Sequence, residues 1–327
     1  MSAKRPMLNR RLFCGAGGLV LIAAHPVFAQ AQAIVRVPTQ YKTLAEAFAA
    51  LPDAGGVVEI APGTYREKLS LSKPGVHLVG KGKKPEDVVI VWGDSAKMAG
   101  GTGKSASFTV SGDGFRASNL TIQNDYHLTQ PDNPSQAVAL SISADRAVLR
   151  NVRLLGAQDT LYAASKKPTL PSRQYYKDCY IEGHVDFIFG NALAFFDRCH
   201  LHIIERNGAF ITAHSRTADS ETTAYVFDHC RLTTAGEGSY YFGRAWRPYA
   251  QVIFLDTRID GRIHPEGWRE WTPGKTETYA TAHFAEYNSS GPGADVSQRV
   301  FWAKRLTADQ AAKWRLESVF PDRNWIQ

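Results

Sequence analysis

Two aspartates in apolar surroundings are the residues of this sequence best suited to chemistry. Asp186 lies within residues 185–191 (VDFIFGN) and Asp159 within residues 156–162 (GAQDTLY). An ionised carboxylate among such neighbours is costly unless another group pairs with it. Two carboxylates held close together cannot ionise independently, so one keeps its proton while the other is charged. We predict an acid pair in which one member donates a proton and the other attacks an electrophile or acts as a base.

Neutral amides and a cation accompany the acids. Gln158 directly precedes Asp159, and Gln136 leads into an apolar segment. An amide N–H can stabilise an oxyanion without changing the charge of a site. Further along, Arg244 is a candidate partner for an ionised aspartate, and the nearby Trp246 could present a flat face to a sugar ring.

An imperfect repeat must position these side chains. An apolar start, a polar bend, a small residue and alternating apolar positions recur along the chain. The intervals are 32, 28, 20, 31 and 27 residues when the anchors are Asn119, Asn151, Cys179, Cys199, Cys230 and Thr257. Periods of this size indicate stacked structural units, and the short β-branched segments between turn residues indicate strands. We predict an all-β fold, a single-stranded parallel β-helix whose coils contact only their neighbours; an antiparallel sandwich is the alternative.

The repeat also predicts where the acids lie. Asp159 follows its anchor by eight residues, and Asp186 follows its anchor by seven. Nearly equal offsets on neighbouring coils place both carboxylates on one face, although a slip of one residue would turn a side chain inward. Arg206 also follows its anchor by seven residues. We therefore expect Arg206 in the same column, at the substrate-binding surface.

Stacking has a further consequence for the cysteines. Adjacent anchors are expected about 4.8 Å apart, which is within the Cα separation that a disulfide spans. Cys179 and Cys199 have the shortest interval between them, and we predict that they pair, with Cys230 as the competing partner. No Cys/His spacing resembles a zinc site, so we expect no metal.

Helical patterns mark both ends of the repeat. Residues 41–51 combine apolar residues at helical spacing with a high alanine content. Near the other end, Thr307 and Gln310 form a capping-box pattern at the start of residues 306–314. We expect short helices here that cap the two ends of the stack.

The first 33 residues have the pattern of an export signal. An apolar run and small-residue cleavage sites follow four basic residues: Lys4, Arg5, Arg10 and Arg11. The adjacent arginines 10 and 11 indicate the twin-arginine route. We expect residues 1–33 to be removed and residues 34–327 to form one catalytic domain, exported to the periplasm or secreted.

Charge and hydropathy argue against some partners. The sequence carries 38 Lys and Arg against 31 Asp and Glu, a net charge of +7. Without residues 1–33, 34 basic residues face the same 31 acidic ones, which leaves +3. So small an excess does not indicate nucleic-acid binding. No later run is long and apolar enough to cross a bilayer, so we expect no membrane contact after signal removal.

Five segments resemble pectinesterases (pectin methylesterases), in the order that the family has them. They are residues 63–67 (GTYRE), 136–140 (QAVAL), 158–162 (QDTLY), 186–192 (DFIFGNA) and 243–246 (GRAW). The resemblance extends over roughly residues 35–325. It implies an exported bacterial enzyme with a right-handed parallel β-helix that hydrolyses methyl esters of polygalacturonate (pectin, homogalacturonan). It also implies that the enzyme needs no cofactor, and we expect a monomer.

The resemblance assigns roles to individual residues. Asp186 matches the nucleophile, Asp159 the proton donor and acceptor, and Arg244 the group that orients the nucleophile. Gln158 and Gln136 match the amides around the oxyanion. Contacts to the substrate are expected from Trp246, Tyr162 and Phe187. This chain departs from the family at one position: the family's usual Gly-Arg-Pro-Trp is Gly-Arg-Ala-Trp here, with Ala245 in place of proline. The fixed φ of proline is therefore lost at this position.

The acid pair by itself does not choose between reactions. Close carboxylates also cleave glycosidic bonds, and solenoid lyases use calcium with a basic residue, although this sequence lacks an obvious acidic calcium cluster. An acyl esterase or thioesterase that does not act on carbohydrate is a further alternative, as is a binding module without activity. Methanol release from pectin would distinguish a pectinesterase from these alternatives.

Overall fold

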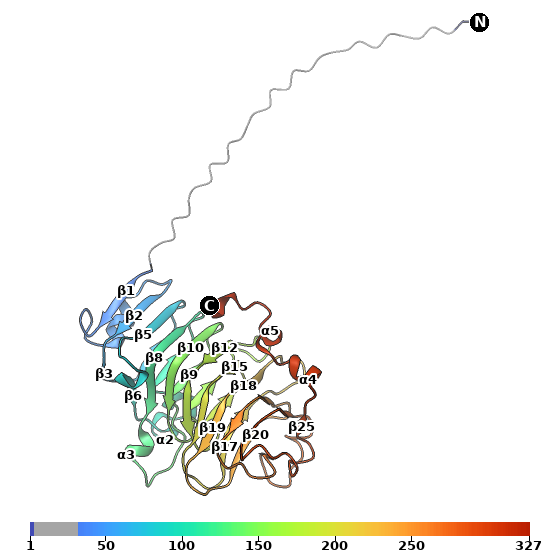
Figure 1. The fold of residues 1–327 in the computed structure, drawn as a ribbon. Coiled ribbons are helices and arrows are strands. Elements are labelled where there is room, and N and C mark those ends of the chain that lie inside the picture. Colours follow the sequence, from blue (N-terminus) through green and yellow to red (C-terminus); the bar gives the residue numbers. More distant parts are fainter. Residues whose placement is uncertain (3–31) are drawn as a thin grey trace. The chain divides into compact units, whose positions relative to one another are not determined.

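A computed structural model describes residues 1–2 and 32–327 of the chain. Nearly all of the predicted export signal therefore lies outside the described residues. Residues 32–327 form one compact unit, in which β-strands stack in parallel along the axis of a coil (Figure 1). The predicted parallel β-helix is confirmed. Among the described residues, no helix is long and apolar enough to cross a membrane.

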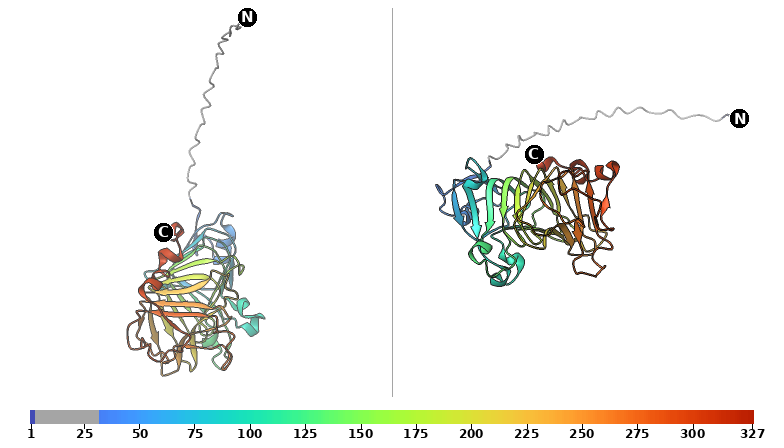
Figure 2. Two further views of the ribbon diagram at one scale, coloured as in Figure 1. Left: turned by 90° about the vertical axis from the view of Figure 1, so that its right-hand side faces the viewer. Right: turned by 60° about the horizontal axis from the view of Figure 1, so that its bottom comes forward.

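Each coil passes through three faces of strands, and strands of successive coils pair in parallel (Figure 2). The first face contains β1 (Ile34–Val37), β2 (Gly56–Ile60), β5 (Val76–Gly80), β12 (Arg173–Lys177), β15 (Leu193–Asp197), β18 (Ala224–Asp228), β21 (Gln251–Leu255), β24 (His283–Tyr287) and β25 (Lys304–Arg305). The second contains β3 (Gly63–Arg66), β6 (Val88–Trp92), β13 (Tyr180–Gly183), β16 (His200–Ile203), β19 (Arg231–Thr234) and β22 (Arg258–Ile259). The third contains β4 (Leu69–Leu71), β7 (Phe108–Val110), β9 (Leu140–Ile142), β11 (Leu161–Ala163), β14 (Ile188–Gly190), β17 (Ala209–His214), β20 (Tyr240–Ala245) and β23 (Trp268–Arg269).

Two long strands, β8 (Arg116–Asn124) and β10 (Ala147–Leu155), run through both the first and second faces. They bend at Asn119 and Asn151, whose φ angles of 56° and 51° lie in the left-handed region. Asparagine and aspartate tolerate this conformation better than most residues. The Asn151 amide also donates a 3.0 Å hydrogen bond to Asn119 Oδ1. The polar bend of the repeat is thus a column of left-handed residues that turns each coil.

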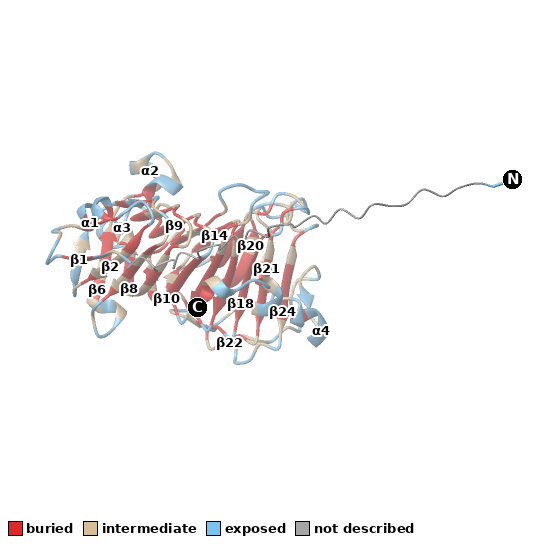
Figure 3. Ribbon diagram, turned by 90° about the horizontal axis from the view of Figure 1, so that it is seen from above, coloured by how far each residue is buried: buried red, intermediate tan, exposed pale blue. Residues whose placement is uncertain are grey.

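The interior of the helix is filled by side chains stacked from coil to coil. An aromatic column joins Tyr176, Phe196, Phe227 and Phe254, with centroid separations of 4.6, 4.5 and 4.5 Å. Stacked rings of this kind contribute more than their buried area alone. The buried residues follow the strands, whereas exposed residues gather in the short helices and connecting loops (Figure 3).

The cysteines lie next to one another in this interior, but the predicted disulfide is not present in the structure. Cys179, Cys199 and Cys230 are buried, free thiols, in register on three successive coils. Each Sγ instead lies 3.3–3.5 Å from a main-chain carbonyl oxygen of the preceding coil. Side chains of paired strands are about 4.8 Å apart and point the same way, whereas a disulfide needs its Cβ atoms closer, at about 3.8 Å.

The N-terminal helix caps the interior as predicted. Helix α1 (Leu44–Ala50) begins after Thr43, and Thr43 and Glu46 form a reciprocal capping box. Phe48 faces the apolar interior and stacks on Phe108 at a centroid distance of 5.8 Å. Other short helices lie in connections: α2 (Ala96–Ala99), α3 (Tyr126–Thr129), η1 (Pro85–Asp87) and η2 (Thr102–Ser105).

The C-terminal helices lie elsewhere than predicted. Helix α4 (Ala308–Ala312) has the expected capping box of Thr307 and Gln310. However, α4, α5 (Leu316–Val319) and η3 (Asn324–Ile326) pack along the outer surface of the first face (Figure 1). Outward-facing side chains there are apolar, among them Val148 and Phe195. The C-terminal segment covers this surface instead of the end of the stack because that is where buried apolar area can be gained.

Candidate active site

The two predicted acids lie side by side on the third face. They occupy the turns that lead into β11 and β14, where Leu161 pairs with Ile188. Asp159 and Asp186 are each two residues before this pair, and their φ angles are 66° and 51°. The main-chain N–H of Asp159 donates to Val185 O at 3.1 Å. Both side chains are nearly buried, with exposed fractions of 8% and 5%.

The observed register explains why the acids match. Val152, not Asn151, lies opposite Cys179 on the neighbouring coil. Counted from these true partners, Asp159 and Asp186 each follow by seven residues. The one-residue difference expected from the sequence came from choosing the bend residue as the anchor of one coil and its successor as the anchor of the next.

Arg244 reaches the acids from two coils away. Its Nε and Nη2 atoms donate to the two carboxylate oxygens of Asp186 at 3.0 and 2.7 Å. The coil between them carries Ala213 in register with Arg244, and this small side chain leaves room for the guanidinium group to pass. Paired hydrogen bonds of this geometry fix the orientation of a carboxylate.

Two aromatic rings contact the guanidinium group. The Cζ atom of Arg244 lies 4.4 Å from the ring centroid of Phe210 and 4.2 Å from that of Trp271. Both distances are well inside the range of a cation–π interaction. Gly243 allows β17 and β20 to approach each other next to Arg244, because a Cβ atom there would lie 2.0 Å from Thr212 Oγ1. Arg244 is thus oriented by aromatic stacking as well as by its ion pair.

The predicted position of Arg206 is wrong. Four extra residues enter the turn between β16 and β17, so Phe210 takes the place beside Asp186 on the next coil. Arg206 is absent from the described residues that line the cavity around the acids. A register argument fails wherever one coil has a longer turn than its neighbour.

The environment gives the two carboxyl groups different proton affinities. Burial raises the pKa of Asp159 well above its ordinary value, and the nearby charge of Asp186 raises it further. Burial also raises the pKa of Asp186, but the hydrogen bonds and positive charge of Arg244 oppose this shift. The proton of the pair is therefore held by Asp159, while Asp186 carries the negative charge beside Arg244.

Both predicted glutamines lie in the same cavity, which has a volume of about 250 Å³. The main-chain oxygen of Gln158 accepts from Ala137 N at 3.0 Å, and that of Gln136 accepts from Ala96 N at 2.8 Å. These bonds hold both glutamines at the start of their coils. The arrangement offers two neutral amide groups next to a charged carboxylate and a protonated one.

Aromatic residues form the wall of the cavity. Trp246 lines it, so alanine at position 245 does not remove the tryptophan from the site. Tyr162 is not among the described residues that line the cavity; it is partly buried and stacks on Phe189, which does line it, at 4.5 Å and 3°. The prediction for Phe187 is wrong, because that ring is fully buried in the interior of the helix. It cannot reach a substrate in this conformation.

Several cavity residues were missed from the sequence: Thr102, Phe189, Ala213 and Trp271. Phe189 could have been predicted from the sequence, because it follows Asp186 by three residues just as Tyr162 follows Asp159. No sequence pattern indicated Trp271, since it lies in the loop after β23. Thr102 likewise reaches the cavity from the separate turn η2.

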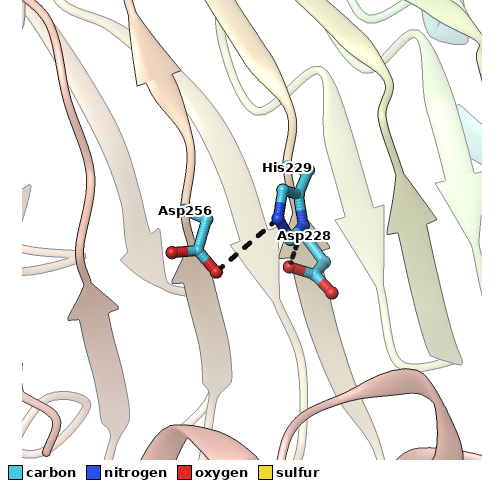
Figure 4. A group of neighbouring side chains, drawn as sticks. All are labelled: Asp228, His229 and Asp256. Atoms are coloured by element: carbon cyan, nitrogen blue, oxygen red, sulfur yellow. Dashed lines mark ion pairs between the residues drawn. The ribbon is translucent and has the colours of Figure 1, made fainter. Parts of the chain in front are cut away.

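A second charged group lies outside this cavity. Asp228, His229 and Asp256 place one potential metal-ligand atom each within 4.8 Å of one another (Figure 4). Arg315 of the C-terminal segment already pairs with both carboxylates, at 2.6 and 2.5 Å. With a guanidinium group in place, the cluster is suited to anchoring that segment and not to binding a cation.

Comparisons of the sequence show which family the chain belongs to. The sequence profile of the pectinesterase family matches residues 35–320. Pectinesterase 31 of Arabidopsis thaliana is 38% identical over 284 residues, covering 83% of this chain and 85% of that protein. Pectinesterase 1 of Olea europaea is 38% identical over 279 residues, covering 83% and 72%.

Solved structures give the same result. The pectin methylesterase from carrot has a TM-score of 0.79 at 28% identity and covers 88% of this chain and 92% of its own. The Aspergillus niger enzyme in deglycosylated form has a TM-score of 0.77 at 31% identity, covering 91% and 96%. The fold and the comparisons define a carboxylic ester hydrolase built on a parallel β-helix. The chain belongs to the pectinesterase family.

Proposed function

We propose that this enzyme removes methyl groups from methyl-esterified polygalacturonate, releasing pectate and methanol. The observation that carries the proposal is the acid pair: Asp159 lies beside Asp186, which Arg244 holds by two hydrogen bonds, and burial together with the charge of Asp186 raises the pKa of Asp159 well above its ordinary value. A structurally similar pectin methylesterase was solved in complex with a hexasaccharide, which supports an oligosaccharide as the ligand of this cavity.

In the first half of the reaction, an Asp186 oxygen attacks the carbonyl carbon of the methyl ester. Negative charge develops on the carbonyl oxygen, where the amide N–H groups of Gln158 and Gln136 stabilise it. The tetrahedral intermediate then expels the methoxy group, which takes its proton from Asp159 and leaves as methanol. The product of this half is an anhydride between Asp186 and the uronate.

In the second half, Asp159 is a carboxylate and accepts a proton from water. The resulting hydroxide attacks the acyl carbon of the uronate, and the anhydride bond to Asp186 breaks. This releases the free acid, returns Asp186 to its charged form and leaves the proton on Asp159. One ester and one water molecule give one acid and one methanol. Trp246 and Tyr162 contact the sugar rings in this proposal.

Methanol release from citrus pectin tests the proposal. We expect release by the native chain and none above background by Asp186→Asn. The matched control is Asp178→Asn, an exposed aspartate that also has a left-handed φ of 52°; it should retain activity. No methanol from the folded native chain would refute the proposal. New reducing ends or unsaturated products would instead indicate a glycosidase or lyase, and cleavage of acyl thioesters without cleavage of pectin a thioesterase.

We also propose that residues 1–33 direct export and that residues 34–327 act as a monomeric catalytic domain in the periplasm or outside the cell. The support is the arrangement of four basic residues, an apolar run and small residues. Mass spectrometry of the mature N-terminus after cell fractionation tests the first part. Light scattering of the purified domain tests the second.

A further inference from the structure

A large pocket lies apart from the catalytic cavity, near the C-terminal end of the coil stack. Its volume is about 680 Å³, and no described residue that lines it also lines the cavity around Asp186. The walls come from the start of β24, from β25 and from the end of α4. This volume is within the range of roughly 300–1,000 Å³ typical of small-molecule sites.

The pocket is cationic. Lys304, Arg305 and Lys313 line it, all three residues are exposed, and no acidic side chain contributes to its wall. None of the three has a carboxylate within ion-pair distance among the described residues. The acid nearest in register, Glu286, is buried and is paired with Arg299 at 2.8 Å. The positive charge of the pocket is therefore uncompensated.

An indole ring and an imidazole line the pocket together with these cations. Trp314 forms part of the wall beside His283, with ring centroids 5.8 Å apart. The Nδ1 atom of His283 lies 3.2 Å from Lys304 Nζ, while its buried Nε2 atom has no hydrogen-bond partner among the described residues. Burial and the charge of Lys304 lower the pKa of His283 to about 4. A neutral imidazole accepts from Lys304 at Nδ1 and leaves the positive charge on the ammonium group of Lys304.

We propose that this pocket is an accessory binding site for demethylated polygalacturonate, the anionic product of the reaction. Carboxylates of the polymer would pair with the three cations, and Trp314 would contact a ring face. The proposal rests on the proposed function, which generates this polyanion. Binding of finished stretches here would keep the enzyme on a partly demethylated chain while the cavity around Asp186 acts on a remaining ester.

Calorimetric titration with a fully demethylated tetragalacturonate tests the proposal. A Trp246→Ala background weakens binding in the catalytic cavity, so that the remaining affinity reports on other sites. Adding Lys304→Gln and Lys313→Gln should then weaken tetramer binding by about tenfold, since two ion pairs are lost. The control adds Lys83→Gln and Lys84→Gln, exposed lysines outside this pocket with the same change in net charge; its affinity should stay within twofold.

Each outcome is decisive. The proposal would be overturned if the variant with Lys304→Gln and Lys313→Gln bound the tetramer as tightly as the variant with Lys83→Gln and Lys84→Gln. Displacement of the tetramer by equimolar inorganic phosphate would also overturn it, because it would indicate a general anion site. A fully methylated tetramer should bind at least about tenfold more weakly, because it lacks the charges. The titration needs no catalysis. Tetramer binding at the pocket without methanol release from pectin would therefore refute the proposed function and leave the pocket assigned to an anionic sugar.

Discussion

Arg244 binds both carboxylate oxygens of Asp186 although a complete coil separates the strands that carry them. The pair places a fixed positive charge next to the proposed nucleophile. Asp159 lies beside this pair, and its pKa is raised by burial and by the negative charge of Asp186. The positive charge of Arg244 acts in the opposite direction and lowers the pKa of Asp159.

Replacing Arg244 should alter both the rate and the pH dependence. We expect Arg244→Gln to lower kcat/KM on the order of 100-fold, because the nucleophile loses its orienting charge. Loss of the cation also raises the pKa of Asp186, which must be ionised to attack. The acid limb of the pH profile should therefore move to higher pH. Arg206→Gln, which removes a cation outside the cavity, should leave the profile unchanged; an equal effect of both changes would contradict the assignment.

The contribution of the aromatic contacts of Arg244 to catalysis should be measurable without removing Arg244 itself. Phe210→Leu removes one ring from the guanidinium group and keeps an apolar side chain. We expect kcat to fall by about 2- to 30-fold, the equivalent of one cation–π interaction of about 0.5–2 kcal/mol, with a shift of the acid limb in the same direction as in Arg244→Gln. The control is Phe301→Leu, since Phe301 is 89% exposed. A loss of thermal stability without any change in the pH profile would show a purely structural role.

Asp159→Asn should stabilise the enzyme while inactivating it. The raised pKa means that the folded state keeps a proton that the unfolded chain loses above the ordinary carboxyl pKa of 3.8. Stability of the native chain therefore falls as pH rises from about this value through the folded-state pKa. We expect Tm of Asp159→Asn to exceed that of the native chain by about 2–4 °C at pH 7, with no difference at pH 3. Scanning calorimetry at both values checks this, and a difference that is the same at both would rule out the protonation argument.

Arg315 should contribute to stability and not to activity. Arg315→Gln removes two ion pairs that tie the C-terminal segment to Asp228 and Asp256. The three side chains are 13–24% exposed, so we expect a loss of about 1–3 kcal/mol in the free energy of unfolding. Arg258→Gln breaks a more exposed pair with Asp260 and should change the free energy of unfolding much less than Arg315→Gln does. Urea unfolding measures both, and methanol release should remain unchanged in each.

Much of the fold was predictable because the repeat is a local property. Strand length, bend residues and alternating apolar positions recur within each coil, and stacking requires only that neighbouring coils agree. The capping boxes at Thr43 and Thr307 are equally local. The location of the C-terminal helices was not predictable, since it depends on apolar side chains such as Phe195 on the outer surface of a face formed over the whole chain.

The catalytic site shows the same division. Asp159 and Asp186 were found from their apolar neighbours and similar offsets, because paired strands preserve sequence offsets in space. Arg206 and Phe187 were misplaced, the first by four extra residues in one turn and the second because its ring faces the interior. The disulfide prediction considered the spacing between coils but not the direction of the side chains.

The sequence by itself determined the parallel β-helix, the acid pair with its glutamines, and the resemblance to pectinesterases. All of these depend on residue types at short or regularly repeated intervals. Only the tertiary structure decided that Arg244 holds Asp186, that Phe210 and Trp271 orient Arg244, and that three cations surround a separate pocket. Those contacts join residues from different coils and loops, and turn lengths set their relative positions. Sequence separation alone does not carry that information.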